Sequence, residues 1–307
     1  MTITIENNPD ITDGLPGLYP DVPEEAYHSI PACNQSRLKL LGEKSEAHVY
    51  HEMQNPTPPT PEMEFGSAVH VAVLQPDQLE RRYVVVGQCA GQTQKGERCA
   101  NGGSIIIDGH SFCRRHVPKT GTPDDRRTIR QVDFDRCRDM RDSVYACASA
   151  RDALEHPDPT ELSALWSWNV DGFPLPCKAR MDKLLPSAGA IADLKTTVDA
   201  SPRGFVRAVY TYGYYVQAAF YTQGAAALGC ACDDFLIVAV EKEPPFACAI
   251  YRVRDDAIEA GFNELQPLLL RYAHAVQTNT WPSYPQTPIE IGLPDYAWKQ
   301  ITERIEA

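Results

Sequence analysis

The sequence lacks any apolar run long enough to cross a lipid bilayer, for which a helix needs about 20 such residues. The first ten residues, MTITIENNPD, are polar and acidic. They therefore have neither the basic start nor the apolar centre of a secretory signal peptide. These two absences argue against a membrane or secreted protein, and we expect a cytoplasmic chain with no membrane partner.

Positive charge is also scarce, because 29 Lys and Arg residues stand against 41 Asp and Glu residues, a formal net charge of −12. Proteins that bind nucleic acid through its phosphates usually present a basic surface, so this balance argues against such a partner. It does not exclude a nuclease. Carboxylates that hold divalent cations count as negative in the sequence, and the bound cations reverse that charge locally.

The chain is long enough for one substantial core with a small appended module, since it has 307 residues, of which 43% are hydrophobic. Ten cysteines in a chain expected in the cytoplasm indicate thiols or metal ligands before disulfides. Three of them cluster in one short polar segment. The others are scattered, mostly among apolar neighbours, where we interpret them as small buried side chains.

The spacing of apolar and helix-breaking residues predicts an α/β domain with a mixed sheet flanked by helices. A first helix is expected from Ser36, as its N-cap, and a second from Met63 to Leu74 after a Pro-rich spacer, residues 55–63. Further helices are expected at 124–154, 203–228 and 255–277, and strands at 162–170, 177–185, 190–195, 235–241 and 248–253.

The chain divides by composition into a core with one insertion. We assign residues 1–25 to a flexible N-terminal arm, 26–87 and 119–295 to the core, 88–118 to the insertion, and 296–307 to a C-terminal tail. The insertion is rich in Gly, Cys and polar residues and has too few large apolar residues to form a core of its own.

Two acidic residues in consecutive strand-like runs, Asp182 and Asp193, carry the predicted chemistry. Antiparallel pairing of these runs would bring the two carboxylates together, and Lys195 would point to the same face as Asp193. Carboxylates hold Mg²⁺ or Mn²⁺, and a nearby lysine can orient or deprotonate water, or donate to the transition state of phosphodiester hydrolysis. Taken alone, so short a pattern is better explained by two surface acids and a salt-bridging lysine.

The surrounding residues resemble the PD-(D/E)XK nucleases, in particular the exonuclease VIII (RecE-like) group of phage recombination and the related RecB nuclease domain. Asp182 takes the place of the first motif acid, and Asp193-Leu194-Lys195 matches the (D/E)-x-K signature. The segment from Gly66 to His70 is similar to the GxxxH helix of these families. The resemblance implies a restriction-endonuclease-like core and makes His70 a metal ligand. A lone histidine on an apolar helical face is more often a core residue.

Three further residues enter through the same resemblance. Gln217 and Tyr221 match the Q-x-x-x-Y motif and share one helical face, from which they could touch the scissile-phosphate region. Helix packing explains the same two residues equally simply. Glu161 resembles the acidic residue before the first core strand and is a candidate for a further Mg²⁺ or Mn²⁺ ligand.

The resemblance implies a processive 5′→3′ exonuclease on linear duplex DNA, which leaves a 3′ single strand for an annealing protein. Such enzymes are commonly ring-like homo-oligomers. Two alternatives remain open. The chain could be a nuclease-like module that binds DNA or protein, or a nuclease of another kind, an endonuclease or a single-strand-specific enzyme.

The insertion supplies four soft or borderline metal ligands, Cys89, Cys99, Cys113 and His116. The C-x-x-H pair at its end lets one turn offer two ligands to a tetrahedral ion. The segment resembles small treble-clef-like zinc knuckles, so we expect a structural Zn²⁺, with an iron–sulfur cluster as the alternative. Its basic residues outnumber its acidic ones, which suggests that it contacts either the DNA backbone or a partner protein.

Overall fold

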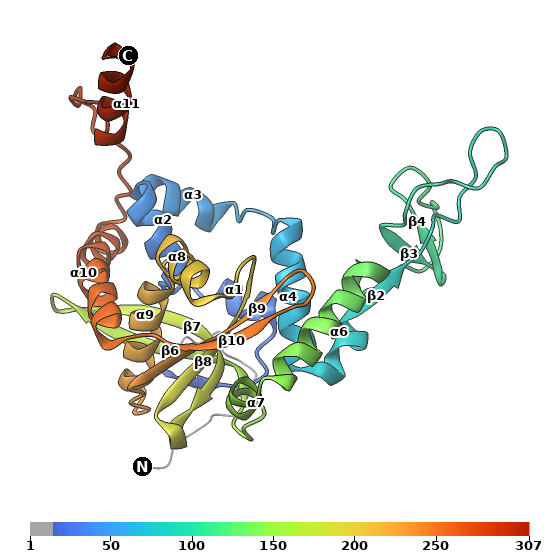
Figure 1. The fold of residues 1–307 in the computed structure, drawn as a ribbon, viewed down its shortest axis with the longest axis horizontal. Helices are drawn as coiled ribbons and strands as arrows, with labels where there is room; N and C mark the ends of the chain where they lie inside the picture. Colours follow the sequence, from blue (N-terminus) through green and yellow to red (C-terminus); the bar gives the residue numbers. More distant parts are fainter. Residues whose placement is uncertain (1–14, 307) are drawn as a thin grey trace.

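A six-stranded sheet forms the centre of the fold in the computed structural model, which describes residues 15–306 (Figure 1). Its strands, in spatial order, are β1 (Gly17–Tyr19), β6 (Thr160–Val170), β7 (Phe173–Leu185), β8 (Ala190–Thr197), β9 (Asp234–Glu241) and β10 (Cys248–Arg252). Only β8 and β9 pair in parallel, and the other neighbours are antiparallel. The predicted mixed sheet is therefore confirmed.

Helices cover both faces of this sheet. The helices are α1 (Glu24–Ser29), α2 (Gln35–Glu43), α3 (Glu46–Gln54), α4 (Pro61–Leu74), α5 (Leu79–Arg82), α6 (Gln131–Ala146), α7 (Ala148–Leu154), α8 (Pro202–Tyr212), α9 (Tyr214–Ala227), α10 (Asp255–Thr278) and α11 (Asp295–Ile305). One apolar cluster joins one face of the sheet to α2, α9 and α10, and a second joins the other face to α4, α6 and α7.

Burial on both faces explains why the central strands are nearly continuous apolar runs. In β9, Ile237 and Ala239 pack in the first cluster, whereas Val238 and Val240 pack in the second. Successive side chains of a strand point to opposite faces, so a strand covered by helices on both sides needs apolar residues at every position. The parallel pair also requires a crossover between β8 and β9, which α8 and α9 supply.

The N-terminal part of the chain is more ordered than the sequence suggested. Residues 1–14 of the predicted flexible arm lie outside the described residues, but β1 pairs with β6 at the edge of the sheet, so the prediction is wrong from Gly17 onward. The N-cap of α2 is Asn34, whose side chain accepts a hydrogen bond from the Arg37 amide, and not Ser36. Helix α4 begins at Pro61, since proline is tolerated in the first turn.

Two of the predicted long helices are divided. Residues 127–130 of the expected helix 124–154 form β5, because they pair in parallel with β2 (Tyr83–Val86), and the rest breaks at Cys147. The expected helix 203–228 is interrupted at Gly213, whose φ of 69° lies in the left-handed region that glycine adopts without strain. Helix α11, Asp295–Ile305, contains most of the predicted tail, residues 296–307.

The insertion projects from the body on the two-stranded sheet of β2 and β5 (Figure 1). Its hairpin consists of β3 (Ile105–Ile107) and β4 (His110–Phe112). Residues 119–126 pack on this hairpin through the bonds from Asp108 N to Thr122 O and from Asp124 N to Ile106 O, so the module extends beyond Pro118. We call residues 79–130 the lateral arm. Among residues 15–306, none of the helices combines the length and hydropathy that a bilayer crossing requires.

Candidate active site

The site forms where β7 and β8 separate. The antiparallel ladder between these strands runs from Leu185↔Ala190 to Lys183↔Ala192 and ends one residue before Asp182 and Asp193. The predicted strand pairing is thus confirmed. Across the opening, Asp182 Oδ2 accepts a hydrogen bond of 2.7 Å from the backbone N–H of Leu194. Both carboxylates therefore lie at one fork of the sheet and are buried, with side-chain exposures of 9% and 3%.

Asp193 is held by two side chains that approach from the same face of the sheet. Lys195 Nζ lies 2.6 Å from its Oδ2, and Gln217 Nε2, from α9, donates to its Oδ1 at 2.7 Å. Tyr221, one helical turn beyond Gln217, is in hydrogen-bond contact with that amide. In this structure, Gln217 orients Asp193 directly, and Tyr221 acts only through its contact with Gln217.

Asp182 belongs to a second group of ligands, with His70 from α4 and Glu161 from β6. One ligand atom from each of the three lies within 4.8 Å of the others, and His70 Nδ1 is 3.5 Å from Asp182 Oδ2. Asp193 is not part of this set, although the sequence placed it beside Asp182 as a metal ligand. His70 is 26% exposed and Lys195 18%, so the site opens to solvent through these two side chains.

Glu161 occupies a strained position. Its φ is 53°, which a residue with a Cβ rarely adopts. The ladder between β6 and β7 has the pairs Thr160↔Lys183 and Leu162↔Met181 but omits the position between them, where Glu161 faces Asp182. Backbone strain of this kind costs about 1–3 kcal/mol and persists only where the surrounding structure imposes it. This strain is stronger evidence for a functional role of Glu161 than any feature of the sequence.

The charged groups at the fork shift one another's pKa values. Burial raises the pKa of Asp182, but the charge and hydrogen bond of His70, together with Lys195, bring it below its usual value. Burial raises the pKa of Asp193, and Lys195 only partly opposes that rise. For Lys195, burial lowers the pKa, but the two carboxylates outweigh it and the pKa is raised. Lys195 is therefore an ammonium at neutral pH and acts as a donor.

The donor set fits a hard divalent cation. Two carboxylates and one imidazole converge at His70, Glu161 and Asp182, a mixture of oxygen and nitrogen ligands that suits Mn²⁺ or Mg²⁺. Asp193 Oδ2 is also buried and makes no hydrogen bond of normal geometry, its one short contact being the ion pair with Lys195. An oxygen that is buried and under-bonded can accept a cation or a water molecule bound to one.

Sequence reasoning missed two residues around the fork. The ring of Tyr214 lies 5.0 Å from Lys195 Nζ, in a cation–π contact that no sequence motif indicated. Arg82, at the base of the lateral arm, interacts electrostatically with Glu161. Neither could be placed without the tertiary fold.

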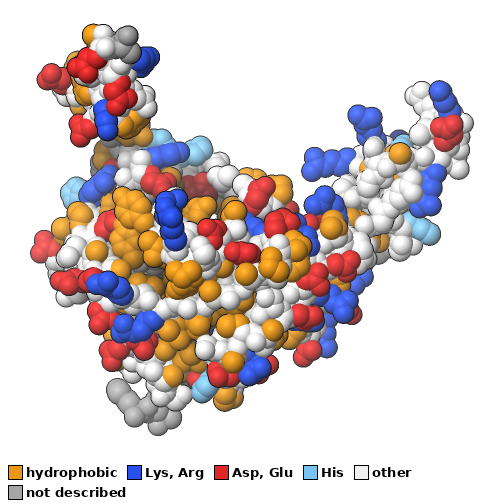
Figure 2. Space-filling model, viewed as in Figure 1, with side chains coloured by type: hydrophobic (Ala, Val, Ile, Leu, Met, Phe, Trp, Pro, Cys, Tyr) orange, Lys and Arg blue, Asp and Glu red, His pale blue; other side chains and the backbone are white. Residues whose placement is uncertain are grey.

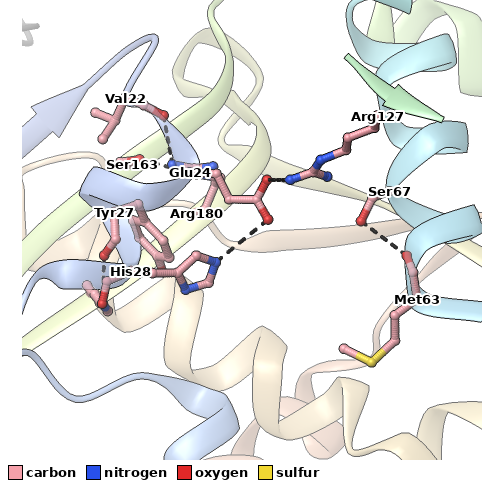
Figure 3. A network of polar contacts seen from close by, with 10 residues as sticks. Val22, Glu24, Tyr27, His28, Met63, Ser67, Arg127, Ser163 and Arg180 are labelled. Carbon is pink, nitrogen blue, oxygen red and sulfur yellow. Dashed lines mark hydrogen bonds and ion pairs between the residues drawn. The ribbon is translucent and has the colours of Figure 1, made fainter. Parts of the chain in front are cut away.

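The strand that carries Asp182 is anchored to the N-terminal segment (Figure 3). Arg180 donates to Val22 O at 2.8 Å and stacks over the ring of Tyr27 at 4.5 Å. In the same network Glu24, in α1, forms an ion pair with Arg127 of β5. The N-terminal segment therefore links the sheet at the fork to the root of the lateral arm.

The insertion brings its four predicted ligands together. His116 Nδ1 lies 3.5 Å from both Cys89 Sγ and Cys113 Sγ, and the sulfurs of Cys99 and Cys113 are 4.0 Å apart. Ligands at the usual zinc distances on a tetrahedron are about 3.6–3.8 Å apart. The cluster is thus compatible with a zinc site. The three cysteines form a small buried cluster of their own, with Phe112 packed against them.

The surroundings of these ligands favour a bound cation. The backbone N–H groups of Gly91 and Cys113 donate to Cys89 Sγ at 3.4 and 3.3 Å. Burial would raise the pKa of Cys113, but the hydrogen bond of the Arg115 backbone and the neighbouring thiols lower it to about 6. Gly91 allows His116 to approach, since a Cβ there would lie 2.5 Å from the imidazole.

Comparison with known families gives a match that covers most of the chain. Residues 35–287 match the family described as "PDDEXK-like domain of unknown function (DUF3799)". No curated protein matches.

Among solved structures, a provisionally named exonuclease from Eubacterium rectale is similar with a TM-score of 0.58 and 14% identity, over 88% of this chain and 96% of that one. At this identity the similarity shows the fold. A phage-related exonuclease from Haemophilus somnus aligns over 34% of this chain and 58% of its own, with a TM-score of 0.25 and 13% identity. That overlap is too small to support an argument.

Proposed function

Because the chain belongs to the PDDEXK-like domain family of unknown function (DUF3799), we propose that it is a divalent-metal-dependent deoxyribonuclease whose centre is the fork of β7 and β8. The observation that carries the proposal is the convergence of Asp182, Asp193 and Lys195 with His70. A module that only binds DNA or protein has no use for two buried carboxylates and an ammonium arranged in this way.

Each residue has a separate role in the proposed reaction. His70, Glu161 and Asp182 would hold Mg²⁺ or Mn²⁺, which when bound lowers the pKa of water and neutralises charge on the phosphate. Lys195 remains an ammonium, so it orients the attacking water or donates to a phosphate oxygen. Asp193 keeps Lys195 in place and is itself oriented by Gln217.

The proposal extends to an exonuclease that acts on the ends of linear duplex DNA in the 5′→3′ direction. Its support is the resemblance of the motif residues to phage recombination nucleases, together with the name of the Eubacterium rectale protein of similar fold. In this proposal, the 3′ strand would pass to an annealing protein, and the enzyme would work as a homo-oligomer. We also propose that Cys89, Cys99, Cys113 and His116 bind a structural Zn²⁺.

Digestion of end-labelled linear duplex with Mg²⁺ or Mn²⁺ tests the proposal. Wild type should shorten linear DNA and leave closed circles intact, whereas Lys195→Ala should lose at least about 10³-fold in rate, or about 4 kcal/mol of transition-state stabilisation. Lys44→Ala, which removes an exposed lysine at the end of α2, is the matched control and should cut normally. Equal rates for the two variants would refute the role of Lys195. Cutting of closed circles would indicate an endonuclease, and no cutting by wild type would favour a binding module.

A further inference from the structure

The positive charge of this protein is concentrated in the lateral arm. Residues 79–130 contain ten Lys and Arg residues against five Asp and Glu residues, a net charge of +5. The rest of the chain carries −17, since the whole has −12. Figure 2 shows Lys and Arg side chains along the projecting arm, while acidic side chains are spread over the body.

Many of these cations form no hydrogen bond or ion pair within the part of the chain that the structure describes. Among the described residues, six exposed side chains of the arm make neither a hydrogen bond nor an ion pair: Arg81, Arg82, Lys95, Arg114, Arg115 and Lys119. Arg126, Arg127 and Arg130, at the root of the arm, are paired with acids. An unpaired, exposed cation is free to exchange its counterions for phosphate groups of a polyanion.

The fold presents these cations in fixed places. Arg114 and Arg115 occupy the two positions between Cys113 and His116, so a metal held by those ligands would order the turn that displays both guanidiniums. At the root, the ion pair of Arg127 with Glu24 joins the arm to the body, and the bond from Arg126 to Glu80 O ties the two ends of the arm together. The basic surface therefore lies on a projection whose root is fixed to the body.

The arm also leads to the active site. Its first helix, α5, follows α4, the helix that carries His70, with only the short 3₁₀ turn Pro76–Gln78 between them. Arg82, the last residue of α5, interacts electrostatically with Glu161, which belongs to the ligand set at the fork. A series of cations thus begins beside the metal ligands and ends at the cysteine–histidine cluster.

We propose that the lateral arm binds the phosphate backbone of duplex DNA and guides it to the fork of β7 and β8. This inference rests on the proposed nuclease function and adds where the substrate is held. The arm supplies the basic surface that the acidic body lacks. Its contacts are with phosphates, so they are independent of base sequence, as a nuclease that degrades any DNA requires.

The salt dependence of DNA binding tests the arm directly. The tip variant combines Lys95→Gln, Arg114→Gln and Arg115→Gln, and its matched control removes the same charge elsewhere with Arg151→Gln, Lys299→Gln and Arg304→Gln. Fluorescence anisotropy of a labelled 30-base-pair duplex is followed against KCl concentration without Mg²⁺ or Mn²⁺, and the DNA is checked on a gel for cutting. Circular dichroism verifies that all the proteins are folded.

Each lost phosphate contact reduces the magnitude of the slope of log affinity against log salt by about 0.9. The tip variant lacks three cations, so the magnitude of its slope should fall by about 3. It should also bind the duplex about tenfold or more weakly at 0.1 M KCl. The control should keep the wild-type slope. Equal slopes for the tip variant and wild type, or equal losses in the tip variant and the control, would overturn the inference.

Cleavage by wild type is scored separately with Mg²⁺. Cutting of DNA together with an unchanged slope in the tip variant overturns the role of the arm and leaves the proposed nuclease intact. A reduced slope in the tip variant without any cutting by wild type supports the arm as a DNA-binding surface, while the nuclease proposal fails.

Discussion

The contact between α9 and α10 depends on a glycine, which makes it a sensitive place to test how the fold supports the site. A Cβ built on Gly261, in α10, would lie 2.5 Å from the backbone oxygen of Tyr215 and 3.0 Å from the Cβ of Ala219, both in α9. Neither atom can rotate away, so Gly261→Ala must push the two helices apart. Gln217, which holds Asp193, lies on α9 between these two contacts.

The expected magnitude follows from two opposing effects. Overpacking a core costs about 1–3 kcal/mol, and a clash with backbone belongs at the upper end of that range. Alanine is favoured over glycine inside a helix by about 1 kcal/mol. We therefore expect Gly261→Ala to lower the free energy of unfolding by about 2 kcal/mol and to reduce nuclease activity, because Gln217 moves away from Asp193.

Gly42, in α2, provides the matched control. A Cβ there would meet Leu268 at 3.5 Å, which is ordinary van der Waals contact, so Gly42→Ala should raise the free energy of unfolding by about 0.5–1 kcal/mol. Urea denaturation measures the free energy of unfolding of both variants, with the same dependence on urea concentration used for each. The reasoning is refuted if Gly261→Ala is as stable as Gly42→Ala, since α9 and α10 would then not approach as closely as described.

Two further predictions concern buried charge and strain. Glu161→Gly should raise the free energy of unfolding in metal-free buffer by about 1 kcal/mol, because glycine adopts the left-handed backbone without strain. The same variant should show no Mn²⁺ binding in calorimetry, because a metal ligand is lost. Glu161→Gln should also lose Mn²⁺ binding, but its free energy of unfolding should not rise. Burial, with Arg37 and Arg180, lowers the pKa of Lys178 to about 7, below its unfolded value of 10.5, so the folded protein loses this proton first. The free energy of unfolding of wild type relative to Lys178→Met, measured in urea, should rise between pH 7 and 10. A constant difference would mean that the three carbonyls around the Lys178 amine keep it protonated.

The parts of the fold that the sequence predicts well are those in which a local pattern and the tertiary environment agree. The apolar runs and the turn between them predict the strands that carry Asp182 and Asp193. The short connection predicts that these strands pair with each other. Strand β5 was missed because Arg127–Arg130 is polar at three of four positions and pairs with β2 outside the main sheet. Only its long-range partner makes it a strand.

The candidate site shows the same division. Local spacing was sufficient to bring Asp193 and Lys195 to one face, since two residues along a strand determine that geometry. Local spacing could not predict that the two carboxylates have different neighbours, because that depends on α4 and α9 approaching from opposite faces of the sheet. The strained backbone of Glu161 has no signature in the sequence at all.

Net charge illustrates why composition alone is a weak guide to the partners of this protein. A charge of −12 argues against nucleic acid only if it is spread evenly, and here an excess of positive charge is confined to 52 residues that the fold extends away from the body. Exposed charges interact over a Debye length of about 8–10 Å, so a polyanion at the lateral arm responds mainly to the arm. The acidic body would then favour the DNA path along the arm by repelling the duplex from every other face, and neutralising acids on the body should broaden DNA binding rather than strengthen it at the fork.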